Sequence, residues 1–373
     1  MIAPKDELTA LLTLGKSNRL DSTKARLLYE ETGSALGIFS EYRNLNDILP
    51  GVTQCLDEVL NDPGLNFAVG NEIEFIKQNR IRCLTMKDAD YPARLKECPD
   101  APLLLFGLGK FNLNPRHTVA VVGTRNATLY GKELAARFVR DLISICPDTL
   151  IISGLAYGID VCAHNSAVDY GAATVGVLAH GLDKIYPPAH REIAKRMLAD
   201  GGLITEFMHG QIPFKRNFVR RNRIVAGMAD AVVVVESAKK GGSLITAEIA
   251  ESYSRSCFAF PGSVGDVNSE GCNNLIRSNR AGLIQSAQDF AEDMGWTSGR
   301  KVNGPVQKEL FSDLSPAGKQ ILECLEKAPK GLELNILVVK CNMNAGDMIS
   351  LLFDLEMKGL VKSHPGCVYT ICR

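Results

Sequence analysis

The sequence predicts a doubly wound α/β domain over residues 117–285, in which helices cover both faces of a parallel sheet. Short runs rich in valine and isoleucine alternate there with longer helical stretches, a pattern typical of buried parallel strands joined by helical crossovers. Turns rich in glycine and basic residues follow several of these strands. Because ligands bind at the carboxyl ends of the strands in such sheets, the turns predict a site for phosphate-bearing ligands.

The alternation places the elements in order along the chain. A short apolar strand is expected within the lead-in, at 103–106. Further strands are expected at 118–122, 150–152, 174–178, 231–235 and 257–260. Helices are expected between them at 131–145, 159–170, 191–199 and 244–254.

The segments before and after this α/β region in the sequence have different residue patterns. Residues 1–78 are predicted to form a helical domain, because apolar residues recur at helical spacing. The α/β domain then spans 79–296, and the hydrophilic stretch 297–307 is typical of a linker. Residues 308–373 predict three helices and a terminal hairpin, a winged-helix-like module.

Composition limits the classes of function that need to be considered. The chain has 373 residues, with 42 basic and 42 acidic side chains, so a polyanion partner must be recognised by local clusters of charge. No apolar run is long enough to cross a bilayer. The 11 cysteines show no metal or disulfide spacing. We therefore expect a cytoplasmic protein that has no membrane contact, bound metal or cofactor.

The first predicted turn after a strand is Gly123-Thr124-Arg125. A glycine directly after a strand lets the backbone approach a phosphate at a helix N-terminus. The turn lacks the G-x-G-x-x-G dinucleotide fingerprint, because Arg125 and Thr128 stand at the second and third glycine positions. NAD is therefore disfavoured as the ligand.

The second turn runs from Ser153 to Asp160 and contains Gly154 and Gly158. Asp160 and His164 are four residues apart on the helix that follows, so they can share one face. We favour structural roles for both, with Asp160 capping the helix, over a metal or acid–base site.

The third feature is the basic run at 213–223, which holds five positive residues and no acid. If the run is helical, Lys215, Phe218 and Arg221-Asn222 lie on one face. An aromatic ring flanked by cations suits a stacked base whose phosphates lie on the basic groups. The alternative is a solvated helix face.

The fourth feature, the stretch from Glu236 to Ser243 that ends in Lys239-Lys240-Gly241-Gly242-Ser243, precedes the helix expected at 244. Glycines with Ser243 as N-cap and a basic pair predict an anion-binding nest, although a plain turn stays possible. A weaker glycine turn follows at Gly271. Several such turns along one sheet predict a basic, glycine-lined groove over the strand ends.

The ordered motifs resemble the DprA (Smf) family of DNA-processing proteins over about residues 80–290. The matching positions are Gly123-Thr124-Arg125, Ser153-Gly154-Leu155-Ala156, Gly158-Ile159-Asp160, Ala163-His164, Gly181-Leu182-Asp183, Tyr186-Pro187, Thr205-Glu206, Phe218, Arg221-Asn222-Arg223, Gly242 to Ala247, Pro261-Gly262, Gly271 and Asn273. Val219 and Gly241 depart from the pattern, where proline and serine are common.

The resemblance implies an extended Rossmann-like core, an N-terminal domain resembling a sterile alpha motif (SAM-like), and a C-terminal winged helix. It also implies a non-catalytic single-stranded-DNA-binding protein that dimerises through its core. Such a protein would protect incoming DNA and load the recombinase RecA in natural transformation and recombination. Single-strand-binding protein is a further candidate partner.

The turns and the resemblance together yield one set of expected DNA-binding residues and no catalytic ones. These residues are Gly123, Arg125, Gly154, Gly158, Lys215, Phe218, Arg221, Asn222, Arg223, Lys240, Gly242 and Ser243.

Two alternatives stay open at this point. The first is a nucleotide-processing enzyme of the phosphoribohydrolase type, in which Arg221 and Glu248 would act on a nucleotide monophosphate. The second is a RecA-adaptor scaffold whose DNA contact is incidental. The expected recognition helix of the winged-helix module, 345–358, carries three acids and one lysine. Since a helix that reads duplex DNA is expected to be basic, we expect this module to contact protein.

Overall fold

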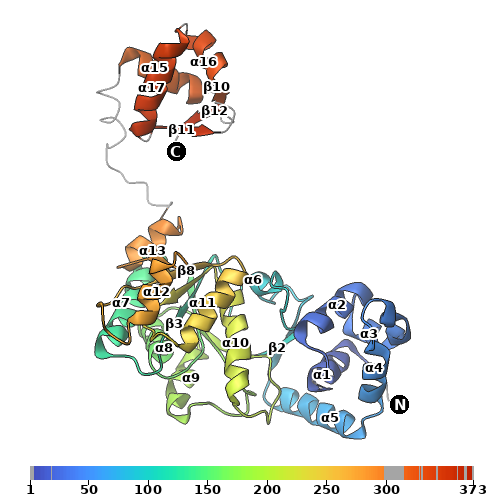
Figure 1. The fold of residues 1–373 in the computed structure, drawn as a ribbon. Coiled ribbons are helices and arrows are strands. Elements are labelled where there is room, and N and C mark those ends of the chain that lie inside the picture. The colour runs from blue at the N-terminus through green and yellow to red at the C-terminus, as the bar shows by residue number, and fades with distance from the viewer. Residues whose placement is uncertain are drawn as a thin grey trace. The chain divides into compact units, whose positions relative to one another are not determined.

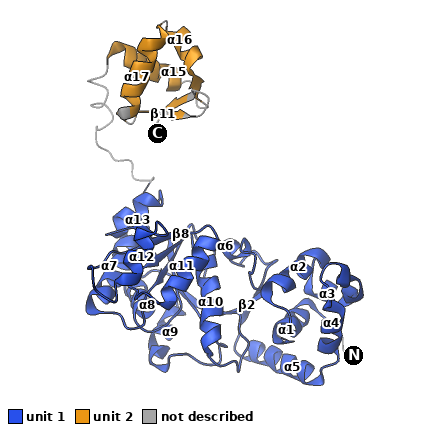
Figure 2. Ribbon diagram, in the orientation of Figure 1, with its two compact units in different colours: residues 1–299 blue, residues 300–373 orange. Residues whose placement is uncertain are grey.

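The computed structural model describes residues 4–17, 19–297, 315–326, 328, 331–341, 343–358, 360–364 and 368–371 (Figure 1). The chain divides into two compact units, residues 1–299 and 300–373 (Figure 2). Apart from Thr297, the linker predicted at 297–307 lies outside the described residues. The boundary predicted at 78/79 falls within the first unit and stays a prediction.

The first unit begins with a group of helices that pack on one another at one end of the sheet (Figure 1). They are α1 (Glu7–Ser17), α2 (Ser22–Thr32), α3 (Ala35–Glu41), the 3-10 helix η1 (Tyr42–Asp47), α4 (Val52–Leu60) and α5 (Pro63–Gln78). Side-chain caps define several of their starts: Asp21 accepts from Lys24 N, and Ser34 accepts from Gly37 N. The helical region expected from apolar spacing is therefore present.

The sheet contains both parallel and antiparallel strands. They are β1 (Arg82–Thr85), β2 (Leu104–Gly109), β3 (His117–Val122), β4 (Thr149–Ser153), β5 (Thr174–Val177), β6 (Gly202–Thr205), β7 (Ala231–Val234), β8 (Ser256–Ala259) and β9 (Gly282–Leu283). Their order is β1-β2-β6-β5-β4-β3-β7-β8-β9. From β6 to β9 all neighbours are parallel, whereas β2 joins β6 and β1 joins β2 in antiparallel fashion.

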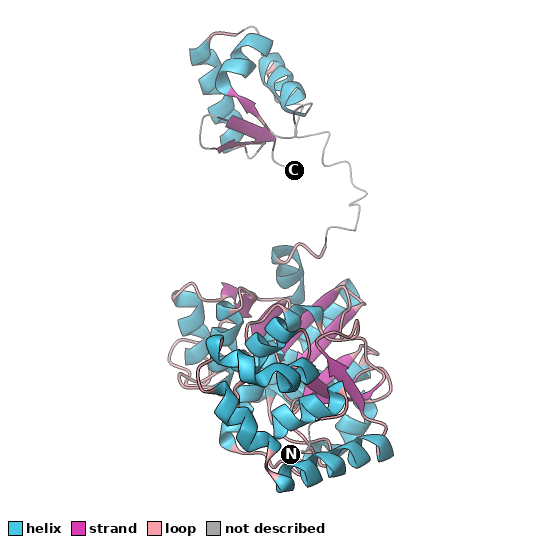
Figure 3. Ribbon diagram, turned by 90° about the vertical axis from the view of Figure 1, so that its right-hand side faces the viewer, coloured by secondary structure: helices cyan, strands magenta, loops and turns pink. Residues whose placement is uncertain are grey.

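Helices connect these strands across both faces (Figure 3). They are α6 (Ala93–Lys96), α7 (Leu129–Ile145), α8 (Ile159–Asp169), η2 (Pro188–His190), α9 (Arg191–Met197), α10 (Lys215–Gly227), α11 (Gly242–Ser252), α12 (Glu270–Arg277) and α13 (Ala287–Asp293). Val119 and Val121 of β3 pack with α7, α8 and α13, whereas Ala120 and Val122 pack with α10, α11 and α12. Alternate residues of one buried strand thus serve two cores, which confirms the doubly wound prediction.

Strand order reverses between β3 and β7. The chain moves outward from β3 through β4, β5 and β6, then returns to the other side of β3 with β7, β8 and β9. In open α/β sheets the connections diverge at such a point and leave a crevice at the carboxyl ends of the two strands. The residues that follow Val122 and Val234 therefore border the expected ligand site.

Three strands of the first unit and one helix start differ from expectation. β1, β6 and β9 were not predicted, since none of them forms a long β-branched run; β6 pairs with both β5 and β2. Helix α11 begins at Gly242, with Gly241 as N-cap, so the prediction that Ser243 caps this helix is wrong.

Polar contacts tie the N-terminal helices to the sheet. The Glu72 carboxylate on α5 accepts from His209 N at 3.2 and 3.1 Å, and the His209 ring stacks on Phe75 with centroids 4.7 Å apart. Arg223 on α10 donates to Ser22 Oγ at 3.2 Å. These contacts join both ends of the helical region to the α/β core.

The second unit has its own small core. It contains α15 (Pro316–Glu326), β10 (Leu332–Glu333), α16 (Leu334–Cys341), α17 (Ala345–Met357), β11 (Val361–His364) and β12 (Val368–Ile371). The strands pair antiparallel in the order β10-β12-β11. Leu322, Leu337 and Leu352 from the three helices meet in the core, as the winged-helix prediction requires.

No single helix within the described ranges has the length and apolar composition needed to cross a membrane. One bent pair, Leu334–Cys341 with Ala345–Glu356, meets the requirement by length and composition only.

Candidate functional site

A cavity of about 330 Å³ lies at the switch point between β3 and β7. The turns after β3, β4 and β7 contribute to it, and α10 forms the remaining wall. Its lining comprises Val122, Gly123, Thr124, Arg125, Gly154, Ala156, Asp160, Phe218, Val219, Arg221, Asn222, Val225, Gly241, Gly242, Ser243 and Thr246. We call this space the switch-point groove.

The buried Glu236, directly after β7, holds the first turn in place. Its backbone oxygen accepts from Thr124 N at 2.7 Å. Its carboxylate accepts from Thr128 N at 2.9 Å and from Thr128 Oγ1 at 2.7 Å. Because three bonds fix the backbone on both sides of Arg125, this exposed arginine projects from a rigid turn.

The second turn is closed by Asp160, a buried residue in the first turn of α8. Its carboxylate accepts from Gly154 N at 3.1 Å and from Ala156 N at 3.4 Å. Burial raises the pKa of Asp160, while the positive charge of Arg221 and the two N–H donors act against that rise. Asp160 therefore stabilises the loop before its helix instead of capping the helix itself; the N-cap is Gly158.

Glycine is required at two positions of this turn for different reasons. Gly158 has φ +78°, and a Cβ there would lie 2.1 Å from Thr124 O. The turn after β4 therefore packs directly on the turn after β3. At Gly154 a Cβ would lie 2.5 to 2.7 Å from the guanidinium atoms of Arg221, so the missing side chain makes room for that arginine.

Arg221 is a structural part of the groove wall, with 3% of its surface exposed. Its Nη1 donates to Gly154 O at 2.6 Å and also to Val177 O, and its Nε donates to Asn222 Oδ1 at 3.2 Å. Burial lowers its pKa to about 10, with Asp160 opposing that change and Arg125 adding to it. Arg221 therefore stays charged at neutral pH and places positive charge beneath the groove.

An aromatic ring lies close to two cations of the groove. The Phe218 centroid is 4.9 Å from Arg125 Cζ and 6.0 Å from Arg221 Cζ. The Tyr186 ring lies on the same side of the site, with its centroid 5.9 Å from that of Phe218. Such a cluster suits a flat, electron-rich group carrying negative charge nearby.

The N-terminus of α11 forms the opposite wall. No side chain caps it, and Ser243 Oγ donates to Ser237 Oγ at 2.9 Å instead of reaching a backbone N–H. The first N–H groups of the helix are thus available to an anion. Lys240 is exposed just before this wall, while its neighbour Lys239 lies 3.3 Å from Glu270 Oε1.

The structure brings together most of the residues expected to bind DNA, but not all of them. Those that line the groove are Gly123, Arg125, Gly154, Phe218, Arg221, Asn222, Gly242 and Ser243. Gly158 supports the turn from behind, and Lys240 and Lys215 are exposed without lining the groove.

Arg223 faces away from the switch-point groove. It is buried, with Nη2 at 2.7 Å from Glu206 Oε2 and Nη1 at 2.5 Å from Asp100 O. Arg223 directly follows Asn222 in α10, and the rotation of about 100° per residue turns it toward a different face of the helix. A role for Arg223 in positioning α10 therefore fits better than direct contact with a ligand.

His164 and Glu248 also lie outside the groove lining. His164 is fully buried, and its Nδ1 lies 2.7 Å from Thr174 Oγ1. Glu248 is exposed on α11, with Oε1 3.7 Å from Arg280 Nη2. Within the described residues, no group of three or more His, Cys, Asp or Glu side chains could hold a metal ion.

Sequence reasoning did not assign roles to Glu236 or Tyr186. The signal for Glu236 was an acid immediately after a buried strand, where a solvent-facing loop would begin. Tyr186 was quoted only within a motif, because nothing in the sequence places it beside Phe218.

Two family models match the chain. One, described as DNA recombination-mediator protein A, covers residues 82–295, and the other, the DprA winged helix domain, covers residues 309–367. The Smf protein of Synechocystis sp. is 32% identical over 336 residues, which is 80% of this chain and 83% of that protein.

Solved structures are similar as well. The X-ray structure of DNA processing protein A (DprA) from Streptococcus pneumoniae aligns with TM-score 0.64 and 30% identity, covering 78% of this chain and 98% of that one. A DNA processing protein A from Helicobacter pylori, described for its single-stranded DNA binding mode, aligns with TM-score 0.53 and 27% identity. That alignment covers 58% of this chain and 96% of the H. pylori chain.

Proposed function

The chain belongs to the DNA recombination-mediator protein A (DprA) family, and from this premise we propose that it binds single-stranded DNA in the switch-point groove. Phe218 receives a base, Arg125 and the uncapped start of α11 receive phosphates, and Lys240 extends the positive edge. The H. pylori relative, described as a single-stranded DNA binder, supports the choice of ligand.

The observation that carries the proposal is the Phe218 ring in the groove lining, whose centroid lies within 6.0 Å of the guanidinium carbons of both Arg125 and Arg221. A base has an aromatic face to stack on that ring, whichever base it is. A duplex keeps its bases stacked inside, so this ring favours an unpaired strand.

We propose a binding role without catalysis. The two carboxylates closest to the groove have structural duties: Asp160 accepts from two backbone N–H groups, and Glu236 holds the turn around Arg125. The enzyme alternative needed Glu248 beside Arg221, yet Glu248 pairs with Arg280 and Arg221 is buried on backbone carbonyls. Release of free base from nucleotide monophosphates by pure protein would restore that alternative.

Family membership supports a proposal for the biological role. We propose that the chain protects incoming single strands and loads RecA on them in natural transformation or recombination, with single-strand-binding protein as a further partner. We also propose that it works in the cytoplasm as a homodimer through the α/β core. Capture of RecA by a variant unable to bind DNA would favour a simple adaptor role instead.

Fluorescence anisotropy with matched single-stranded and duplex oligonucleotides tests the proposal. We expect strong preference for the single strand, with the logarithm of affinity falling linearly with the logarithm of salt concentration. Equal affinity for the duplex, or binding indifferent to salt, would contradict the proposed ligand.

A further inference from the structure

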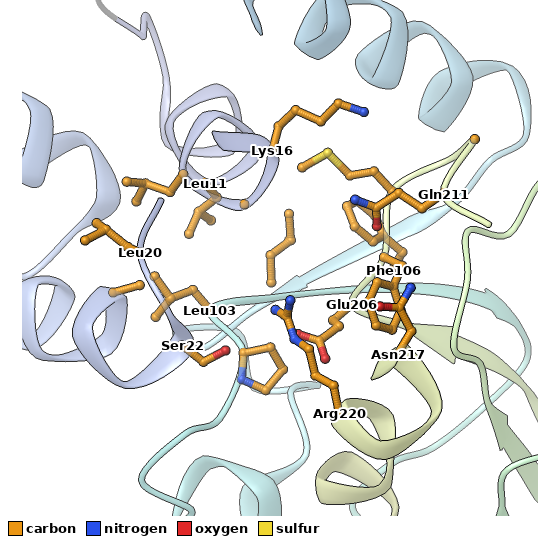
Figure 4. Close-up of a pocket in the computed structure, with 18 of the residues that line it drawn as sticks. Leu11, Lys16, Leu20, Ser22, Leu103, Phe106, Glu206, Gln211, Asn217 and Arg220 are labelled. Atoms are coloured by element: carbon orange, nitrogen blue, oxygen red, sulfur yellow. The ribbon is translucent and has the colours of Figure 1, made fainter. Parts of the chain in front are cut away.

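A second cavity, of about 600 Å³, lies between the N-terminal helices and the sheet edge. Residues of α1, the α1–α2 connection, β2, the segment after β6 and the start of α10 line it (Figure 4). We call it the α1–α10 cleft. The switch-point groove does not include any of its lining residues.

The walls of this cleft are held by direct contacts. Gly15 of α1 approaches Met208 so closely that a Cβ would lie 3.3 Å from the methionine Cε. Arg223 reaches Ser22 on α2, and Glu72 on α5 binds His209 beside the cleft. Both sides of the cleft therefore belong to one compact unit.

Positive charge exceeds negative charge among the lining residues. Lys16, Arg216 and Arg220 are the cations, and Glu206 is the one acid among the described lining residues. Glu206 is already paired with Arg223, at 2.7 Å, and both side chains are buried. The charge of Glu206 is thus matched inside the protein, and the cations at the cleft leave it net positive.

Arg220 is positioned to meet a ligand. Its Nη2 lies 2.7 Å from Glu206 Oε2, and its Cζ lies 5.5 Å from the Phe207 ring centroid. Figure 4 shows its guanidinium directed toward Glu206 inside the cleft. The side chain is still 46% exposed, so further N–H donors of this oriented arginine face the open space.

Apolar surface is also exposed at the rim. Phe214 is 55% exposed and Ile212 is 49% exposed, both in the segment that leads into α10. The open Phe214 ring therefore lines the same cavity as the cations Arg216 and Arg220. A ligand with a flat apolar part and a negative charge would satisfy both features.

One helix connects the cleft with the groove. Phe218, Arg221 and Asn222 of α10 line the groove, whereas Asn217 and Arg220 of the same helix line the cleft. Phe214 is the N-cap of α10, four residues before Phe218, and Arg220 lies two residues after Phe218 on the same helix. A strand that passes from the groove across α10 into the cleft therefore meets Arg220 on the helix and Phe214 at its start.

We propose that the α1–α10 cleft binds a further nucleotide of the same DNA single strand, with its base on Phe214 and its phosphate on Arg220 and Arg216. This inference rests on the proposed function, because it extends the bound strand beyond the groove. The N-terminal helices then contribute to DNA binding by forming the far wall of the cleft.

Affinity as a function of oligonucleotide length tests the inference in the full chain. Wild-type protein gains affinity when a short oligonucleotide that fills the groove is lengthened. Phe214→Ala and Arg220→Gln are each expected to remove about tenfold of affinity for the long oligonucleotide, the effect of one lost stack or phosphate contact. Both variants keep wild-type affinity for the short one.

Matched controls separate this effect from general loss of charge or apolar surface. Arg196→Gln removes an arginine that is 49% exposed and paired with Asp169, and Phe67→Ala removes an aromatic ring that is 73% exposed. Neither residue lines a cavity described above. Both controls should bind long and short oligonucleotides as the wild type does, and unfolding curves establish that all four variants fold.

A photo-crosslinking phenylalanine analogue at position 214 supplies a second readout, and it should crosslink to the long oligonucleotide. The inference would be overturned if Phe214→Ala and Arg220→Gln kept wild-type affinity for long oligonucleotides. It would also be overturned if the analogue at position 214 crosslinked only to protein and not to the oligonucleotide. If wild-type protein binds no single strand of any length, the proposed function has failed instead.

Discussion

At the scale of single residues, Phe218 carries the most specific expectation. Phe218→Ala should weaken single-stranded DNA binding by roughly 1–3 kcal/mol, the measured range for one stacked base. Phe218→Tyr keeps a ring near Arg125 and Arg221 and should stay close to wild type. Anisotropy titrations on several base compositions check this, and a loss limited to one base would contradict stacking as the cause.

Arg221 and Lys240 are both basic, yet they should differ in what they stabilise. Arg221→Ala leaves two buried carbonyl oxygens and the buried Asp160 without their cation, so we expect a loss of about 3–5 kcal/mol in the free energy of unfolding. Lys240→Ala should leave unfolding unchanged because Lys240 is exposed.

The same pair should separate in DNA binding. Lys240→Ala is expected to weaken binding for all sequences and to reduce the salt slope by about one phosphate contact. Urea unfolding and salt titrations of both variants check the contrast. An Arg221→Ala protein with wild-type stability would show that the arginine is not a structural part of the wall.

His164 predicts a pH dependence of stability. Burial, with electrostatic interactions from Arg221 and His190, lowers its pKa to about 3, whereas an unfolded histidine titrates near pH 6.5. At pH values between these two pKa values, His164 is protonated in the unfolded chain and neutral in the folded protein. Stability therefore falls as pH drops below about 6.5, by up to ~1.4 kcal/mol per pH unit from this residue.

His164→Gln removes that proton uptake and keeps a polar group near Thr174. The measurement is the urea unfolding free energy at several pH values. We expect a shallower acid slope in the variant, with the part due to His180, whose pKa burial also lowers, still present. Identical slopes in the two proteins would mean that folding does not lower the pKa of His164.

At the scale of elements, the turns after β3 and β4 shape the switch-point groove because they pack against each other. Gly158→Ala should damage both turns, since its Cβ would meet Thr124 O and its backbone has a positive φ. Gly171→Ala is the matched control: it has φ +71° and no atom within 4 Å of the added Cβ. The control should lose about 1 kcal/mol for the backbone conformation alone.

Gly158→Ala should lose clearly more stability than Gly171→Ala, and it should also weaken DNA binding by shifting Arg125. Thermal unfolding and anisotropy report the two effects separately. Equal losses in the two variants would mean that the contact between the turns is unimportant.

The same scale explains how much could be read from the sequence. Val119 and Ala120 begin the apolar run 119–122 of β3, so the burial of this strand on both faces was predictable. Glycine turns after such strands predicted the groove. The burial of Arg221 was not predictable, because its partners Gly154 O and Val177 O are brought to it only by sheet order.

Arg223 and Ser243 show the same limit. A basic run indicates an exposed helix face, yet Arg223 is buried because it pairs with Glu206, which is distant in the sequence. Ser243 has the residue type of an N-cap, but Gly241 takes that place and the serine turns to Ser237. Local residue type predicts local structure well only where no tertiary partner competes for the side chain.

At the scale of the whole molecule, binding and winged-helix parts are chemically distinct. The first unit collects exposed cations around two cavities on either side of α10. In the second unit, the exposed side of α17 presents Ile349 and Phe353, which are 50% and 61% exposed, beside the acids Asp347 and Asp354. An apolar and acidic helix repels phosphate and suits contact with protein.

A chain ending at residue 299 should therefore bind single-stranded DNA with wild-type affinity and an unchanged salt slope. The truncation leaves the core of the first unit intact, since Trp296 still packs against Phe290 and His117. The full chain should show no added, salt-sensitive affinity for duplex DNA over the truncated one. If removing residues 300–373 abolished a duplex affinity that salt reverses, α17 would be a DNA-contacting helix in spite of its acids.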